Sequence, residues 1–279
     1  MHNNNSGVRR KYALINCPVP PWHVDQFAVL GHRGAKGYAP ENTLPSFEKA
    51  IELGANMTEL DVHLSKDGAL VVMHDDDVSR TTDGQGKIAS LTLAEIKKLD
   101  AGSWFSPLFA GTPVPTLEEV VELVKGRILL NIEVKKTDHL YQGIIPKILD
   151  VLLKYDMVTQ TVISSFQIEY LKEMKRILPA ANLALLYKDE ALAVKKAKAS
   201  SDMDEAVDIV DVAVREGWNG LHCHLSQAYP ALITKAHRHG IRVRAWNPNE
   251  PEQMRPLLTM GVDGIGTDYP DRLLELIMA

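Results

Sequence analysis

The feature that most constrains the fold is a regular alternation of short apolar runs with helical patterns. Strands are predicted at residues 28–31, 57–64, 69–73, 128–134, 161–165, 183–187, 219–223, 241–246 and 263–266. Helices are predicted at 43–53, 116–125, 139–154, 167–178, 189–199, 203–216, 228–239, 250–260 and 270–278. Repeated strand–helix units without a run of hairpins build a parallel sheet. Eight or nine strands suit a closed (β/α)8 TIM barrel better than an open sheet.

Two stretches fall outside this alternation. Residues 1–26 have the composition of a polar, proline-containing arm, so we expect the barrel to span residues 27–279. Residues of about 75–115, after an early strand, contain several glycines and prolines and one short helix predicted near 91–99. A loop this long inside a domain is usually a lid or a small inserted subdomain. The region 200–216 is longer than a plain connection needs and suggests no function.

Composition excludes several classes of protein. A net charge of −5 leaves no basic surface for nucleic acid. The two cysteines, Cys17 and Cys223, are too few for a disulfide framework and lack metal-ligand spacing. The sequence has no GxGxxG or Walker motif, no membrane-spanning apolar stretch and no signal peptide, because prolines interrupt the N-terminal apolar run. We therefore expect a cytoplasmic protein without membrane insertion, and homo-oligomerisation stays open.

Polar residues with catalytic chemistry follow the predicted strands. In such a barrel the active site lies at the carboxyl ends of the strands. His32 and Arg33 end the first strand, and His74 ends the run at 69–73. Glu133 and Lys135 share a face at the end of 128–134. Imidazoles can transfer protons and the two cations can bind anionic oxygens, so this set suits phosphoryl transfer.

Three carboxylates suggest a metal. Glu59 and Asp61 project to the same face of one strand because side chains alternate, although spacing alone leaves open whether that face is inside the barrel. With Glu133 they would form an all-oxygen site suited to one Mg²⁺ or Ca²⁺. Zinc would normally take more nitrogen or sulfur ligands. Arg33 and Lys135 could instead be ion-pair partners of these carboxylates.

Seven segments, in order, carry a family resemblance: HRGAKGYAPENT, ELDVHLSKDGALVVMHD, RTTDGQGK, NIEVK, SSF, AWNPN and GVDGIGTDYPD. Together they resemble the glycerophosphodiester phosphodiesterase family over residues 28–279. That family carries an insertion where residues 75–115 lie. The resemblance implies a metal-dependent phosphodiesterase that converts small glycerophosphodiesters, such as glycerophosphocholine or glycerophosphoethanolamine, to glycerol 3-phosphate and an alcohol.

The resemblance also implies a role for each candidate residue. His32 and His74 would be the acid/base pair. The remaining roles are metal binding by Glu59, Asp61 and Glu133, phosphate binding by Arg33 and Lys135, and an apolar wall near the glycerol at Trp246. One departure is Asn247-Pro248, where the family usually has threonine after the tryptophan.

Other polar residues on late strands have competing explanations. His222 and His224 share a face, which could suggest a second metal, but the family motif has no ligands there. Arg244 lies two residues before Trp246 on the same strand, so both side chains should project to the same face, toward the barrel interior. Arg244 could there contact an anionic end of the substrate or pair with Asp263.

Two alternative functions remain. A phospholipase C/D-type barrel acting on lysolipids or phosphoinositides would share the histidine pair. A catalytically inert barrel would bind phosphodiesters without cleaving them. The three carboxylates and the insertion argue against the first alternative, and two titrating histidines argue against the second.

Overall fold

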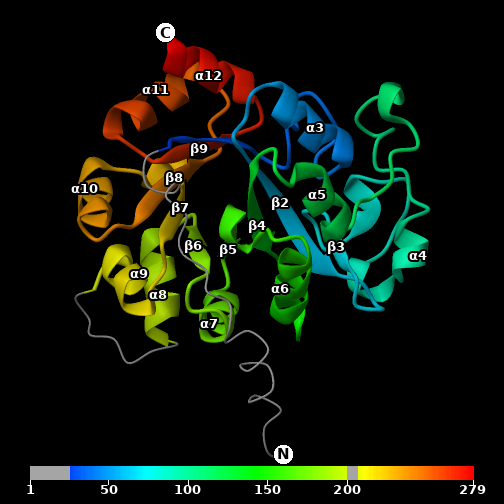
Figure 1. Ribbon diagram of the computed structural model, residues 1–279, viewed down its shortest axis with the longest axis horizontal. Helices are drawn as coiled ribbons and strands as arrows, with labels where there is room; N and C mark the ends of the chain where they lie inside the picture. The colour runs from blue at the N-terminus through cyan, green and yellow to red at the C-terminus, as the bar shows by residue number, and fades with distance from the viewer. Residues whose placement is uncertain (1–25, 200–206) are drawn as a thin grey trace, which may run out of the picture.

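The structure is a computed structural model that describes residues 26–199 and 207–279. Figure 1 shows a ring of strands surrounded by helices. The ring consists of eight parallel strands: β1 (Ala28–Gly31), β2 (Met57–Leu64), β4 (Leu129–Val134), β5 (Thr161–Ser165), β6 (Asn182–Tyr187), β7 (Gly220–His224), β8 (Arg242–Trp246) and β9 (Gly264–Thr267). β1 pairs with both β2 and β9, so the sheet closes and the predicted TIM barrel is confirmed.

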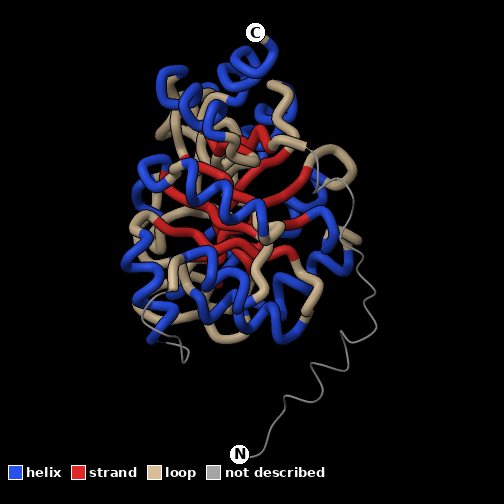
Figure 2. Tube along the Cα trace, turned by 90° about the vertical axis from the view of Figure 1, so that its left-hand side faces the viewer, coloured by secondary structure: helices blue, strands red, loops and turns tan. Residues whose placement is uncertain are grey.

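Helices cover the outside of this ring, as the view in Figure 2 also shows. They are α3 (Leu44–Glu52), α5 (Leu117–Val124), α6 (Ile144–Lys154), α7 (Ile168–Ile177), α8 (Glu190–Ala199), α9 (Ile209–Glu216), α10 (Pro230–Arg238), α11 (Pro251–Met260) and α12 (Pro270–Met278). Each connects consecutive strands or follows the last one. None of the helices in the described ranges combines the length and apolar character needed to cross a bilayer.

Side-chain alternation on the strands separates the core from the site. On β2, Leu60 and Val62 are fully buried against the helices in the main apolar core. Glu59 and Asp61 therefore face the barrel interior, which decides the question that their spacing left open. The same strand thus contributes both to the core and to the candidate site.

The helix predicted at 139–154 is shorter than predicted, because α6 begins only at Ile144. Gly143, directly before α6, has φ 76°, a left-handed conformation that does not belong to a right-handed helix, so the helix cannot extend back through it. The backbone N–H of Tyr141 donates to the Tyr170 hydroxyl, and the Tyr141 hydroxyl lies 2.9 Å from Nδ1 of His63. These tertiary contacts hold the residues before α6 in a non-helical loop.

Two further predictions concern segments outside the described residues. Most of the expected arm, residues 1–25, lies there, as do residues 200–206. The helix predicted at 203–216 is observed as α9, which begins at Ile209 after an Asp208 cap that accepts bonds from the N–H groups of Val210 and Asp211.

The insertion segment, residues 75–115, lies between the strand β3 (Leu70–Val72), which pairs antiparallel with β2, and α5. It contains the short helix α4 (Leu93–Ile96) and three 3₁₀ turns. It has a small apolar core with its flanking residues, consisting of Val71, Met73, Val78, Ile88, Ile96, Ala101 and Val114. This core stabilises the segment beside the mouth of the barrel.

Gly34 holds the loop after β1 against α3. Its φ is +83°, and a Cβ at this position would lie 2.3 Å from Oγ of Ser46. The same Ser46 hydroxyl donates to the carbonyl of Arg33 at 2.9 Å. Close backbone approach at Gly34 therefore sets the direction in which Arg33 leaves the strand.

We expect Gly34→Ala to lower the free energy of unfolding by more than Gly111→Ala does. Both glycines have positive φ, but no described atom lies within 4 Å of a Cβ at Gly111. The control should lose about 1–2 kcal/mol from backbone strain, and Gly34→Ala about 1–3 kcal/mol more from overpacking. Urea unfolding of both variants measures the difference; equal losses would contradict the role of close packing at Gly34.

Candidate active site

A cavity of about 180 Å³ opens at the carboxyl ends of the barrel strands. Seven of the eight predicted site residues line it: His32, Arg33, Glu59, His74, Glu133, Lys135 and Trp246. The eighth, Asp61, lies behind them and is only 1% exposed. The closed barrel thus brings together residues that are up to 214 positions apart in the sequence.

The three carboxylates form one buried cluster. Ligand oxygens from Glu59, Asp61 and Glu133 lie within 4.8 Å of one another. Asp61 on β2 is the direct neighbour of Glu133 on β4 in the strand register. Within residues 26–199 and 207–279, this is the only group of three or more potential metal-ligating side chains.

Arg33 and Lys135 pair with this cluster, as one sequence-based alternative expected. Nζ of Lys135 lies 2.7 Å from Glu133 Oε1 and 3.3 Å from Asp61 Oδ1. Nε of Arg33 lies 3.4 Å from Asp61 Oδ2, and its backbone N–H donates to Glu59 at 2.9 Å. Both cations also line the cavity, so these pairs leave them accessible to a ligand.

The cluster divides its charge unequally. Burial would raise the pKa of Asp61, but Lys135 and Arg33 outweigh it and hold that pKa far below its usual range. Burial raises the pKa of Glu59 well above normal, and repulsion by Asp61 and Glu133 raises it further. Burial also raises the pKa of Glu133, although Lys135 partly opposes this. In the absence of a further cation, Glu59 therefore binds a proton more readily than an ordinary glutamate does.

The donor set fits a hard divalent cation. Oδ2 of Asp61 accepts a hydrogen bond from Asn42 at 2.8 Å, whereas Oδ1 receives no hydrogen bond from any described residue and has the Lys135 ammonium 3.3 Å away. This oxygen can therefore also serve as a metal ligand. Three carboxylates without a histidine or cysteine suit Mg²⁺ or Ca²⁺.

His32 is held by a carboxylate that the sequence reasoning missed. Its Nδ1 lies 2.7 Å from Oδ1 of Asp268, and Asn249 donates to the other oxygen of Asp268 at 2.8 Å. This pairing leaves Nε2 of His32 as the ring nitrogen available for a proton in the cavity. Burial lowers the pKa of His32, and the Asp268 hydrogen bond opposes that shift.

His74 has the same arrangement with a different carboxylate. Its Nδ1 lies 2.6 Å from Asp75 Oδ1, and the other oxygen of Asp75 lies 2.5 Å from Nε of Arg80 in the insertion segment. Burial would raise the pKa of Asp75, but the hydrogen bonds from Arg80 and His74 lower it to about 2. Glu41 accepts hydrogen bonds from Arg80 at 2.7 Å and from Arg33 at 2.8 Å.

An unbroken chain of hydrogen bonds therefore runs from Arg33 through Glu41, Arg80 and Asp75 to His74. Its intermediate members were not assigned roles from the sequence. Asp75 directly follows His74, and this adjacency was an available signal. Glu41 and Arg80 carry no spacing signal, since their pairing depends on how the insertion segment folds back.

Trp246 forms an aromatic wall. Its indole N–H donates to the carbonyl of His222 at 3.0 Å, and Phe166 and His224 pack edge-on to its ring at 5.9 and 5.1 Å. The two late histidines point to separate partners, because His224 lies 2.8 Å from the Ser226 hydroxyl and His222 lies beside Arg244. This arrangement does not support a second metal site there.

Comparisons with known proteins agree with this geometry. The family model described as "Glycerophosphoryl diester phosphodiesterase family" matches residues 32–272. A glycerophosphodiester phosphodiesterase of Caldanaerobacter subterraneus is 38% identical over 250 residues, which cover 89% of this chain and 97% of the relative. One from Bacillus subtilis is 36% identical over 263 residues, covering 88% and 85%.

A solved structure shows the same fold. The Oleispira antarctica phosphodiesterase in complex with the product sn-glycerol-3-phosphate has a TM-score of 0.80 and 31% identity, covering 92% of this chain and 98% of that one. Since the family model and the relatives match most of its length, this chain belongs to the glycerophosphoryl diester phosphodiesterase family.

Proposed function

We propose that this chain hydrolyses glycerophosphodiesters, such as glycerophosphocholine or glycerophosphoethanolamine, to sn-glycerol 3-phosphate and an alcohol, with one bound Mg²⁺ or Ca²⁺. The observation that carries the proposal is the pairing of two carboxylate-backed imidazoles, His32 and His74, with an acidic triad in one cavity. Family membership and the product complex of the Oleispira antarctica relative support the same substrate class.

The charges of the site fit this substrate. Three ionised carboxylates with Arg33 and Lys135 leave one negative charge, which a divalent cation would convert to one positive charge. A phosphodiester carries one negative charge and would neutralise it. Held by Glu59, Asp61 and Glu133, the cation would supply Lewis-acid stabilisation of the charge that develops on the phosphoryl oxygens.

The histidines would carry the proton transfers. One imidazole removes the proton from the glycerol hydroxyl next to the phosphoester, and this oxygen forms a bond to phosphorus. The other imidazole protonates the alcohol oxygen as its bond to phosphorus breaks. Water then opens the resulting cyclic phosphate to glycerol 3-phosphate. Burial lowers the pKa of His32 and so favours its neutral form, which supports it as the base of the first step.

Hydrolysis of glycerophosphocholine, with coupled enzymatic detection of glycerol 3-phosphate, tests the function directly. We expect turnover that EDTA abolishes and that added Mg²⁺ or Ca²⁺ restores. Activity that survives complete chelation would contradict the metal. Binding of the substrate without turnover would favour an inert binding barrel, and cleavage of lysolipids alone would favour the phospholipase-type alternative.

The two histidines are expected to contribute most of the proton-transfer catalysis. His32→Ala and His74→Ala should each reduce kcat by about 10²–10⁴-fold, with little change in melting temperature. His239→Ala, at an exposed histidine after α10, is the matched control and should keep full activity. A histidine variant that retained most of its kcat would lose the role given to it.

Metal binding should depend on pH through Glu59. Its pKa is raised in the folded state above the unfolded value of about 4.3. As pH rises from the unfolded pKa through the raised folded pKa, ionisation of Glu59 lowers the free energy of unfolding. A bound cation takes the place of the proton and removes this loss. We expect the increase in melting temperature caused by Mg²⁺ or Ca²⁺ to grow with pH.

Thermal unfolding at several pH values, with EDTA or with excess metal, measures this effect. Asp61 has a lowered pKa, so its ionisation changes stability with pH in the opposite direction. The effect of Glu59 is therefore isolated by comparing the metal-dependent shift in melting temperature between the wild type and Glu59→Gln. The variant should show a smaller metal-dependent shift with a weaker dependence on pH. An equal shift in both proteins would show that Glu59 does not bind the metal.

A further inference from the structure

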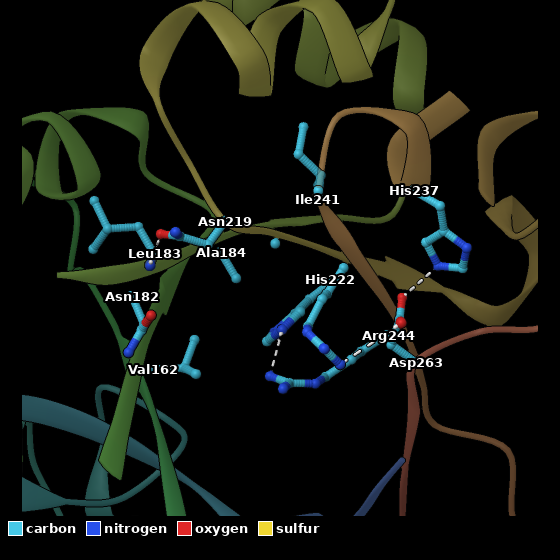
Figure 3. A pocket seen from close by; sticks show the side chains of 13 residues that line it. Val162, Asn182, Leu183, Ala184, Asn219, His222, His237, Ile241, Arg244 and Asp263 are labelled. Carbon is cyan, nitrogen blue, oxygen red and sulfur yellow. Dashed lines mark hydrogen bonds and ion pairs between the residues drawn. The ribbon is translucent and has the colours of Figure 1, made fainter. Parts of the chain in front are cut away.

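The floor of the substrate cavity contains a buried cation. Arg244 on β8 and His222 on β7 line the cavity two residues before Trp246 and His224. At about 3.3 Å per residue, they lie roughly 7 Å deeper in the barrel than the tryptophan. Arg244 is 8% exposed and His222 4%. Figure 3 looks into a separate pocket at the amino ends of the strands, which Arg244 and His222 also line, and shows their two side chains pointing toward one another.

Arg244 lacks the partner expected for a buried guanidinium. Its Nε makes no hydrogen bond within the described part of the chain, and one terminal nitrogen lies 3.4 Å from His222 Nε2. Asp263, the partner considered from the sequence, instead accepts from the Val243 N–H at 2.7 Å and pairs with His237 at 2.8 Å. The Arg244–Asp263 pair, one of the two alternatives considered from the sequence, is therefore not formed.

An acceptor without a donor lies in the same cavity. Asn131 donates through Nδ2 to the Ser164 hydroxyl at 3.0 Å, but its Oδ1 accepts no bond from any residue in the described ranges. Burial keeps the pKa of His222 well below normal, so the floor carries a single positive charge from Arg244. An unpaired buried cation costs stability, and cavities that keep such a group usually bind its counter-ion.

We propose that this floor subsite, formed by Arg244, His222 and Asn131, binds a carboxylate on the alcohol arm of the substrate. The inference rests on the proposed function. In this proposal the alcohol arm extends toward the floor, while the glycerol hydroxyl next to the phosphorus stays beside a histidine nearer the cavity mouth.

Glycerophosphoserine is the head-group chemistry that fits best. Its carboxylate pairs with the Arg244 guanidinium, and its ammonium group can donate to Oδ1 of Asn131. Glycerophosphoethanolamine differs from it only by that carboxylate, so the two compounds form a matched pair. We expect wild-type kcat/KM to favour glycerophosphoserine by about 10–100-fold, the range for a hydrogen bond to a charged group.

Three variants separate this role from a structural one. Arg244→Met should abolish the preference, mainly through a higher KM for glycerophosphoserine, and leave glycerophosphoethanolamine turnover close to wild type. Arg244→Lys should restore part of the preference. Arg242→Met removes the same charge from the same strand outside the substrate cavity and should behave like the wild type. Because the Arg244 cation is unpaired, Arg244→Met should melt at the wild-type temperature or above.

The proposal is overturned if the wild type hydrolyses both compounds equally, or if Arg244→Met slows both equally and melts at a lower temperature. Binding gives an independent readout in EDTA-treated protein. Glycerophosphoserine should raise the wild-type melting temperature more than glycerophosphoethanolamine does, and this difference should vanish in Arg244→Met. Selective binding without hydrolysis of either compound would contradict the proposed function alone, whereas equal binding would contradict the floor subsite.

Discussion

The mutual repulsion of three buried carboxylates is the constraint on which the rest of the site depends. Glu59, Asp61 and Glu133 lie within 4.8 Å of one another, where solvent screens their charges poorly. Arg33 and Lys135 pair with the cluster and offset part of this repulsion. A divalent cation would offset the repulsion that remains and would make the cavity more attractive to an anionic phosphodiester.

Much of the barrel could be predicted from the sequence, because strand and helix periods differ and their alternation admits few topologies. The inward face of β2 could not be derived from spacing alone, since a period of two gives two equivalent faces. The two carboxylates that orient the histidines also differ in how easily the sequence reveals them. Asp75 adjoins His74 in the chain, but Asp268 is 236 residues from His32 and meets it only because β1 pairs with β9 at the seam of the barrel.

The hydrogen-bond and ion-pair partners of buried side chains were the hardest feature to predict. The position of Arg244 on its strand correctly indicates an inward side chain. It has no carboxylate partner because Asp263 instead bonds to His237 and to the Val243 N–H. Likewise, the pattern from residue 139 predicts a helix, but a glycine at positive φ and a tertiary hydrogen bond at Tyr141 delay its start to Ile144. In both cases local preference is overridden by a contact between segments distant in the chain.

The hydrogen-bond chain from Arg33 to His74 passes through Arg80, which belongs to the insertion segment and not to the barrel. One of the two histidines is therefore oriented by a subregion with its own small core. Segments of this kind open locally with less free energy than a whole domain needs. Under the proposed mechanism, the orientation of His74 therefore depends on the local stability of the insertion segment as well as on the barrel.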